Sequence, residues 1–198
     1  MDAAEIEFLS EDVEIKIIPQ FSHSKPIHFI RGSYGPFKAG IPQAVPLFVA
    51  IDLKRKKMCT IEQPHWLTKE YLKNRLKQEK QDTDMFQPIH FHYLEIALQL
   101  LNVARDDIED DNDIHLLLED IENVRSRKLT KGLQKLSKPI LGFRTNNISA
   151  MEINRNRDFV TKSLQTIYDK FADREESEDD DSDMDEDEDE DMNIEAEY

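Results

Sequence analysis

The fold is decided by residues 35–67, which read GPFKAGIPQAVPLFVAIDLKRKKMCTIEQPHWL. Three of the five glycines lie between positions 32 and 40, so this stretch begins as a turn-rich loop. The apolar run Leu47–Leu53 follows, and its short length and β-branched residues predict a buried strand. The basic run Lys54–Lys57 then predicts a polar hairpin turn, with Met58–Ile61 as the partner strand.

Upstream of this stretch the chain also favours short elements. Asp2 can cap a helix over residues 3–9, and strands are predicted at Ile15–Ile18 and Ile27–Ile30. Residues 1–62 are therefore predicted to form a small β-rich module. A module of this size buries only about 60% of its unfolded surface and is marginally stable alone.

After Thr68 the apolar spacing changes from strand-like to helix-like. Thr68 is predicted to cap one helix, residues 90–104 form a helix that is apolar on nearly all sides, and residues 114–136 form a long amphipathic helix. Asn154 is predicted to cap the last helix. The fold class is thus mainly α with a small N-terminal β-rich module, an α+β arrangement that contains a helical bundle domain over residues 63–172. Trp66 lies where the two modules meet and is predicted to pack between them.

The acidity of the chain is confined to its C-terminal end. The formal net charge is −16, and sixteen of the 42 acidic residues lie in residues 175–198, where there is no Lys or Arg. The other 26 acidic residues balance the 26 Lys and Arg. A neutral body argues against a dedicated nucleic-acid-binding domain, which would carry a basic excess. Residues 173–198 are predicted to form a disordered acidic tail.

The chain is expected to be soluble and intracellular. Its single cysteine, Cys59, fits a reducing compartment. No apolar segment follows a basic N-terminus. The most apolar window, residues 91–104, is shorter than the ~20 residues that cross a bilayer.

Catalytic and metal-binding patterns are not found. His90 and His92 are two residues apart, so on a helix they point to different sides and are interpreted as ordinary helix-start residues. Cys59 is predicted to be a buried structural thiol. The glycine loop has no strand–loop–helix context that would bind phosphate. We therefore expect neither enzyme activity nor a cofactor.

Two basic clusters carry alternative interpretations. The Lys54–Lys57 run is interpreted as a solvated hairpin turn, with a nuclear-import patch and a phosphate contact as alternatives. Arg125 and Lys128 share one helix face. They form either a solvated face or a protein interface that meets acids of a neighbouring subunit, and the residues leave both open.

The tail contains two serines that a kinase preferring downstream acids would accept, Ser177 and Ser182. Phosphorylation there would increase a charge that is already high. The tail itself is either a solubilising segment or a segment that binds a basic partner.

Several pieces of the chain, in the same order and at similar spacing, resemble the GINS family of DNA-replication proteins, and within it the second partner of Sld5. They are residues 1–9, residues 35–67, the segment around Arg125, Lys128, Gly132 and Leu133, and Met151–Asn154. The resemblance covers roughly residues 1–172. It implies a nuclear, non-catalytic scaffold subunit of a heterotetramer, with strands first and helices second. It also implies assembly with three related subunits, and with the MCM ring and Cdc45 in the CMG helicase.

Two other functions remain as hypotheses. The acidic tail would suit a chaperone or adaptor for basic nuclear proteins such as histones. The basic run would suit a direct nucleic-acid-binding module, which the neutral body disfavours. The positions of Arg125 and Lys128 also match the family pattern in this helix, and the solvated face and the protein interface both remain open for them.

Overall fold

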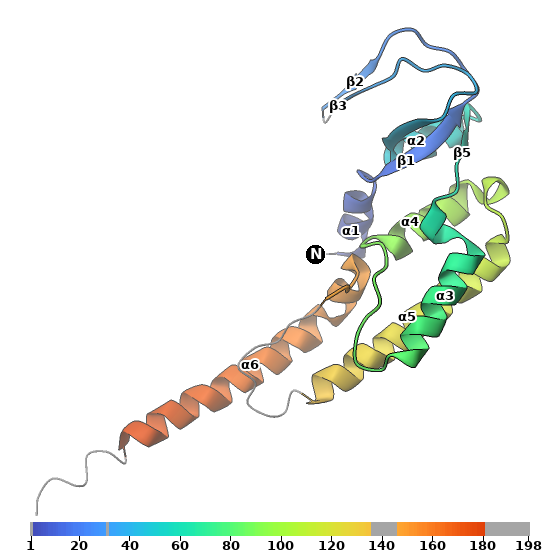
Figure 1. The fold of residues 1–198 in the computed structure, drawn as a ribbon. Coiled ribbons are helices and arrows are strands. Elements are labelled where there is room, and N and C mark those ends of the chain that lie inside the picture. Colours follow the sequence, from blue (N-terminus) through green and yellow to red (C-terminus); the bar gives the residue numbers. More distant parts are fainter. Residues whose placement is uncertain (1, 31, 136–145, 181–198) are drawn as a thin grey trace, which may run out of the picture.

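A computed structural model describes residues 2–30, 32–135 and 146–180 of the chain. It shows a small antiparallel sheet module followed by a helical bundle (Figure 1). The predicted fold class is therefore confirmed. The first element is helix α1 (Ala3–Ser10), which Asp2 caps as predicted.

The β-module is built around one central strand. Strand β1 (Glu14–Pro19) lies between β4 (Gln43–Pro46) and β5 (Cys59–Ile61) and is antiparallel to both. Its side chains alternate between exposed and buried, because one face of the sheet packs on the core. Strands β2 (Ile27–Phe29) and β3 (Gly32–Tyr34) pair separately as a two-stranded ribbon (Figure 1), and Ile27 and Tyr34 of this ribbon pack against the core.

The apolar run at the centre of the opening stretch is a helix, and the predicted strand is wrong. Helix α2 (Leu47–Arg55) begins directly after Pro46, and five of its nine residues are buried. A helix buried on most sides produces the same unbroken apolar run as a buried strand, so periodicity cannot separate them. The predicted hairpin is therefore also wrong. Its second strand, β5, exists but pairs with β1.

The helical domain follows the predicted order. Helix α3 (Lys69–Gln81) packs along α5 (Asp111–Lys135), and α4 (Tyr93–Val103) contributes a largely buried apolar face. Two short 3-10 turns, η1 (His65–Leu67) and η2 (Arg105–Asp107), connect these elements. The last helix, α6 (Ala150–Asp180), begins before Asn154 and extends beyond the predicted tail boundary at residue 172.

The core runs across the predicted boundary between the modules. One contiguous buried cluster contains sheet residues such as Ile17 and Val45 together with helical-domain residues such as Leu72 and Ile96. The sheet module therefore completes its small core with side chains of the helical domain.

Helix α6 is the most extended element of the molecule. Its start lies beside α1 and α5, and the rest projects away from the body (Figure 1). Among the described residues, no helix combines the length and the apolarity that crossing a membrane requires.

Candidate functional site

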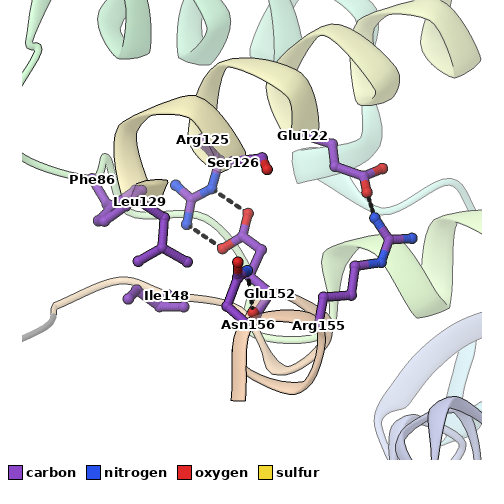
Figure 2. A pocket seen from close by; sticks show the side chains of 9 residues that line it. All are labelled: Phe86, Glu122, Arg125, Ser126, Leu129, Ile148, Glu152, Arg155 and Asn156. Atoms are coloured by element: carbon purple, nitrogen blue, oxygen red, sulfur yellow. Dashed lines mark hydrogen bonds and ion pairs between the residues drawn. The ribbon is translucent and has the colours of Figure 1, made fainter. Parts of the chain in front are cut away.

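The base of α6 is held by one buried arginine. Arg125 lies in the middle of α5, and its side chain is fully buried. It forms a two-pronged ion pair with Glu152 of α6, with Nε–Oε1 at 2.6 Å and Nη2–Oε2 at 2.9 Å (Figure 2). Its Nη1 also donates to Oε1 of Glu79 on α3, at 2.5 Å. One side chain thus connects three helices.

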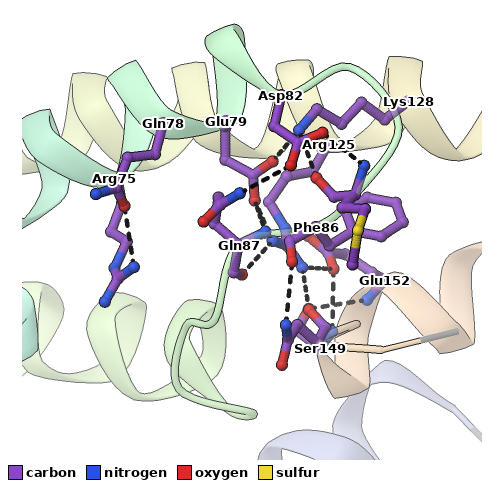
Figure 3. A network of polar contacts seen from close by, with 12 residues as sticks. Arg75, Gln78, Glu79, Asp82, Phe86, Gln87, Arg125, Lys128, Ser149 and Glu152 are labelled. Carbon is purple, nitrogen blue, oxygen red and sulfur yellow. Dashed lines mark hydrogen bonds and ion pairs between the residues drawn. The ribbon is translucent and has the colours of Figure 1, made fainter.

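The same guanidinium also satisfies loop backbone. It donates to the carbonyl of Gln87 at 3.2 Å (Figure 3) and to that of Asn147 at 2.5 Å. Its carbon lies 4.9 Å from the centre of the Phe86 ring, which is a cation–π distance. The segment after α3 and the turn before α6 are therefore both tied to α5.

Electrostatics keeps the buried pair ionised. Burial acts to lower the pKa of Arg125, but the hydrogen bond and charge of Glu152, with the charge of Glu79, outweigh it and the pKa is raised. Burial likewise acts to raise the pKa of Glu152, but Arg125 outweighs it and the pKa is lowered. The Tyr93 hydroxyl donates to Glu152 Oε1 at 3.1 Å. Burial, first of all, raises the pKa of Tyr93 far above its usual range, so the hydroxyl keeps its proton.

Lys128 joins this network one turn later on α5. Its ammonium forms an ion pair with Glu79 and donates to the carbonyl of Met85 at 3.0 Å. Only 9% of the Lys128 side chain and 1% of the Glu79 side chain are exposed. The sequence predicted either a solvated face or acids of a neighbouring subunit for Arg125 and Lys128. Both cations instead meet carboxylates of their own chain, which corrects the basis of that prediction.

The start of α6 explains why Glu152 is in place. Ser149 and Glu152 form a reciprocal N-terminal cap, in which Ser149 N donates to Glu152 Oε2 at 3.0 Å and Glu152 N donates to Ser149 Oγ at 3.4 Å. The Ser-x-x-Glu spacing at 149–152 is a known sequence signal for this cap, and it places the start of α6 before Asn154, the predicted cap. No comparable signal marks Glu79, because it stands in a run of charged residues on α3.

A small cavity lies beside this network. It measures about 80 Å³ and is lined by Phe86, Leu129, Ile148 and Arg155, among others (Figure 2). Arg155 of α6 forms an ion pair with Glu122 of α5 across it. Cavities that bind metabolites measure roughly 300–1,000 Å³, so this one suits water. The arrangement therefore serves to fix the direction in which α6 leaves the body.

Trp66 occupies the junction that the sequence indicated. It lies in η1, directly between β5 and α3, is 7% exposed and belongs to the shared core. Its ring stacks on His90 with centroids 5.2 Å apart and planes at 12°. Burial lowers the pKa of His90, with smaller contributions from His92 and His65, which favours a neutral imidazole. Within residues 2–30, 32–135 and 146–180, no group of three or more His, Cys, Asp or Glu could hold a metal ion.

The basic run lies at the end of α2 and not in a hairpin turn, and Arg55, Lys56 and Lys57 are exposed as expected, whereas Lys54 is not. Lys54 Nζ lies 2.7 Å from Asp107 Oδ2 and 2.9 Å from Asp106 Oδ2, and its side chain is 11% exposed. Asp107 also accepts a hydrogen bond from the backbone nitrogen of Ile61, at 2.7 Å. Lys54 thus ties the sheet module to the helical domain.

The remaining predicted sites lie elsewhere. Cys59 is buried, and burial raises the pKa of its thiol to about 11, so the thiol is protonated at neutral pH. Ser177 lies in the last turns of α6, where only the backbone is described, and Ser182 lies outside the described residues.

An exposed apolar face continues along α6 beyond its base. We call Val160, Leu164 and Tyr168 the α6 stripe, because they repeat every four residues along one side of the helix. Val160 packs against Leu129 of α5, whereas Leu164 and Tyr168 are 42% and 70% exposed. The described part of the chain therefore leaves the outer part of this stripe largely uncovered.

Comparison with known proteins gives two family matches, one over the N-terminal module and one over the helical domain. Residues 2–62 match the PSF2 N-terminal domain, and residues 66–170 match the GINS complex protein helical bundle domain. A human relative named DNA replication complex GINS protein PSF2 is 36% identical over 170 residues, which are 85% of this chain and 91% of the relative. A Candida albicans relative with that name is 35% identical, covering 84% of this chain and 82% of the relative. A Drosophila melanogaster relative, named as probable, is 32% identical over 84% of this chain and 82% of its own length.

Proposed function

The chain belongs to the PSF2 family of GINS proteins, and from this premise we propose that it is a non-catalytic subunit of a heterotetrameric GINS complex in the nucleus. It assembles with the three other GINS subunits. Through them it joins the MCM ring and Cdc45 in the CMG helicase, which serves the initiation and progress of DNA replication. Its own role is to brace the assembly, and ATP is hydrolysed by other components.

The observation that carries this proposal is the α6 stripe on its braced helix. Exposed apolar side chains at helical spacing are typical of a face that another helix covers. The network of Arg125 with Glu79 and Glu152 determines the direction of the helix before any partner arrives. A pre-oriented helix loses less conformational entropy on binding, which favours stable assembly.

Arg125 and Lys128 serve the interface in this proposal, although indirectly. Their charges are satisfied inside the chain, so they position α6 and the loops around its base and do not themselves contact a partner. Trp66 has the corresponding role between the modules, where its ring fills the shared core.

The test is co-expression with the three other GINS subunits from the same organism, followed by size-exclusion chromatography and mass determination. We expect one complex with each subunit present once, and poor solubility of this chain when it is expressed alone. A soluble monomer that ignores the other three subunits contradicts the proposal.

A pair of α6 variants tests the stripe itself. Leu164→Glu places a charge in the stripe, whereas Thr166→Glu places the same charge two positions along and on another side of the helix. Burying an unpaired carboxylate costs several kcal/mol, so Leu164→Glu is expected to reduce recovery of the complex by roughly tenfold or more. Thr166→Glu is the matched control and is expected to assemble normally. Equal recovery of both variants would exclude the stripe as the assembly face.

A further inference from the structure

A second surface is formed where α1 lies beside α2 and α4, close to the base of α6. Helices α1, α2 and α4 enclose a groove of about 360 Å³, which we call the α1–α4 groove. Glu7 and Glu11 line it from α1 and the residue after it, Asp52 and Arg55 from α2, and Leu98 and Gln99 from α4. None of these residues takes part in the network around Arg125.

The groove contains a buried polar group without a partner. Gln99 is 8% exposed, and both Oε1 and Nε2 of its amide are buried without a hydrogen bond to any described residue. Buried polar groups are nearly always hydrogen-bonded in native proteins, because leaving one unpaired costs stability. The missing hydrogen bonds of the Gln99 amide are accounted for if another chain supplies a donor for Oε1 and an acceptor for Nε2.

The charges and the apolar surface of the groove define what that chain carries. Glu7 and Glu11 form no ion pair with a described residue, and Asp52 is paired with Lys56 on the exposed surface. Arg55, on α2 like Asp52, is the cation among the residues that line the groove. Leu98, on the α4 wall, is 49% exposed. The surface thus combines an excess of negative charge with an exposed leucine, which fits a basic residue that lies beside an apolar one.

We propose that the α1–α4 groove is a docking site for a segment of another GINS subunit that carries a Lys or Arg beside an apolar residue. The apolar side chain packs on Leu98, the cation meets Glu7 and Glu11, and a backbone amide group of the segment pairs with Gln99. The acidic C-terminal tail of this chain has the same sign of charge as the groove, so repulsion excludes it as the occupant.

The assignment to another GINS subunit rests on the proposed function and on continuity. Helix α1 contacts both α4 and α6, so the groove adjoins the base of the helix that carries the α6 stripe (Figure 1). A partner that covers this side of α6 is within reach of α1. One assembly face can therefore include both surfaces.

The test uses a photo-crosslinking residue at position 98 in the co-expressed four-subunit complex. Crosslinked peptides are identified by mass spectrometry after the complex has been isolated by size. We expect a crosslink to a segment of another GINS subunit with Lys or Arg next to an apolar residue. The crosslink yield should fall as salt is raised, because the charges at the rim are exposed.

Two groove variants and one control sharpen the result. The double reversal Glu7→Lys with Glu11→Lys should lower the crosslink yield by roughly tenfold, because it places like charges opposite the basic residue. Gln99→Leu should also lower the yield while the chain still folds, because it removes the unpaired amide and keeps a side chain of similar size. The control, Glu14→Lys with Glu70→Lys, reverses two exposed charges outside the groove and should leave the yield unchanged.

The outcomes for the two proposals are separate. If a complex of the expected size forms but position 98 links to nothing, to its own chain, to a second copy or to a segment without a basic residue, the groove proposal is overturned and the proposed function stands. The same holds if the Glu7 and Glu11 reversal leaves the crosslink intact. If no complex forms, the proposed function fails and the groove assignment fails with it.

Discussion

Arg125 shows how much a single side chain decides in this chain. It makes ion pairs to two helices, its side chain is fully buried, and it holds two loop carbonyls in place. Buried ion pairs contribute little net stability compared with apolar residues of the same size. Removal of one member of a buried ion pair is strongly destabilising, because the remaining charge stays buried without an opposite charge.

The Arg125→Ala variant is therefore expected to be strongly destabilised. It leaves Glu152 buried without an opposite charge and Glu79 with Lys128 alone, at a cost of about 3–5 kcal/mol. In a chain of this size that lowers the melting temperature by roughly 10 °C. The matched control is Arg127→Ala, an exposed arginine two residues away on α5, expected within about 0.5 kcal/mol of wild type. Melting is measured by circular dichroism. Equal melting temperatures of the two variants would mean that Arg125 does not stabilise the fold through its ion pairs.

Glu152 predicts how stability depends on pH. Its pKa in the folded chain is lowered from the ordinary 4.5, so its contribution is fully present above about pH 4.5 and is lost as the pH falls through the lowered value. Glu152→Gln cannot ionise and lacks this contribution. The difference in melting temperature between wild type and Glu152→Gln should be large at pH 7 and should shrink on acidification below about pH 4.5. A difference that stays constant with pH contradicts the ion pair.

Among the elements, α6 depends most on how it begins. The reciprocal cap between Ser149 and Glu152 satisfies backbone groups that the first turn leaves free. The same carboxylate also holds Arg125, so the helix start and the buried network share one residue. The direction of α6 and the stability of its first turn are consequently coupled.

Two alanine variants distinguish the observed start of α6 from the predicted one. Ser149→Ala removes the cap and should cost about 1 kcal/mol, whereas Asn154→Ala replaces a residue inside the helix and should be nearly neutral. Hydrogen exchange of the first turn of α6 measures the effect directly, and faster exchange is expected only for Ser149→Ala. The reverse order of effects would place the helix start at Asn154.

At the scale of the whole molecule, the sheet module and the bundle behave as one body with an extended arm. The shared core, Trp66 in η1 and the ion pairs of Lys54 with Asp106 and Asp107 all lie at the junction between the two. The sheet module is too small to be stable without the helical domain. The α6 stripe and the α1–α4 groove lie outside this shared core and are available to partners.

Removal of residues 181–198 is expected to leave assembly with the other GINS subunits intact. That segment is almost entirely acidic or polar, so it offers little apolar surface to bury in an interface. The measurement is recovery of the four-subunit complex by size-exclusion chromatography, with the full-length chain as the control. The alternative function, a chaperone for basic proteins, predicts instead that truncation abolishes binding of histones in a pull-down. Loss of the complex on truncation would assign the tail to the interface.

The sequence by itself determined the features that depend on local pattern or on composition. The β-branched residues of β1, the helical spacing of residues 114–136, the neutral body and the acidic C-terminal segment are all visible among neighbouring residues. The resemblance to the GINS family also came from local segments in order. These properties need no knowledge of what lies across the core.

Only the tertiary structure decided the rest, because the deciding contacts join distant residues. Helix α2 is covered by the sheet on one side and by α4 on another, so apolar residues are needed on most of its surface. Its sequence therefore has no helical periodicity and is equally compatible with a buried strand. Arg125 has acidic partners 46 and 27 positions away, and nothing near it in the chain indicates them. From sequence alone a charged residue is predicted to be exposed, because burying an unpaired charge is costly. Only the tertiary structure shows that opposite charges surround Arg125 and make its burial tolerable.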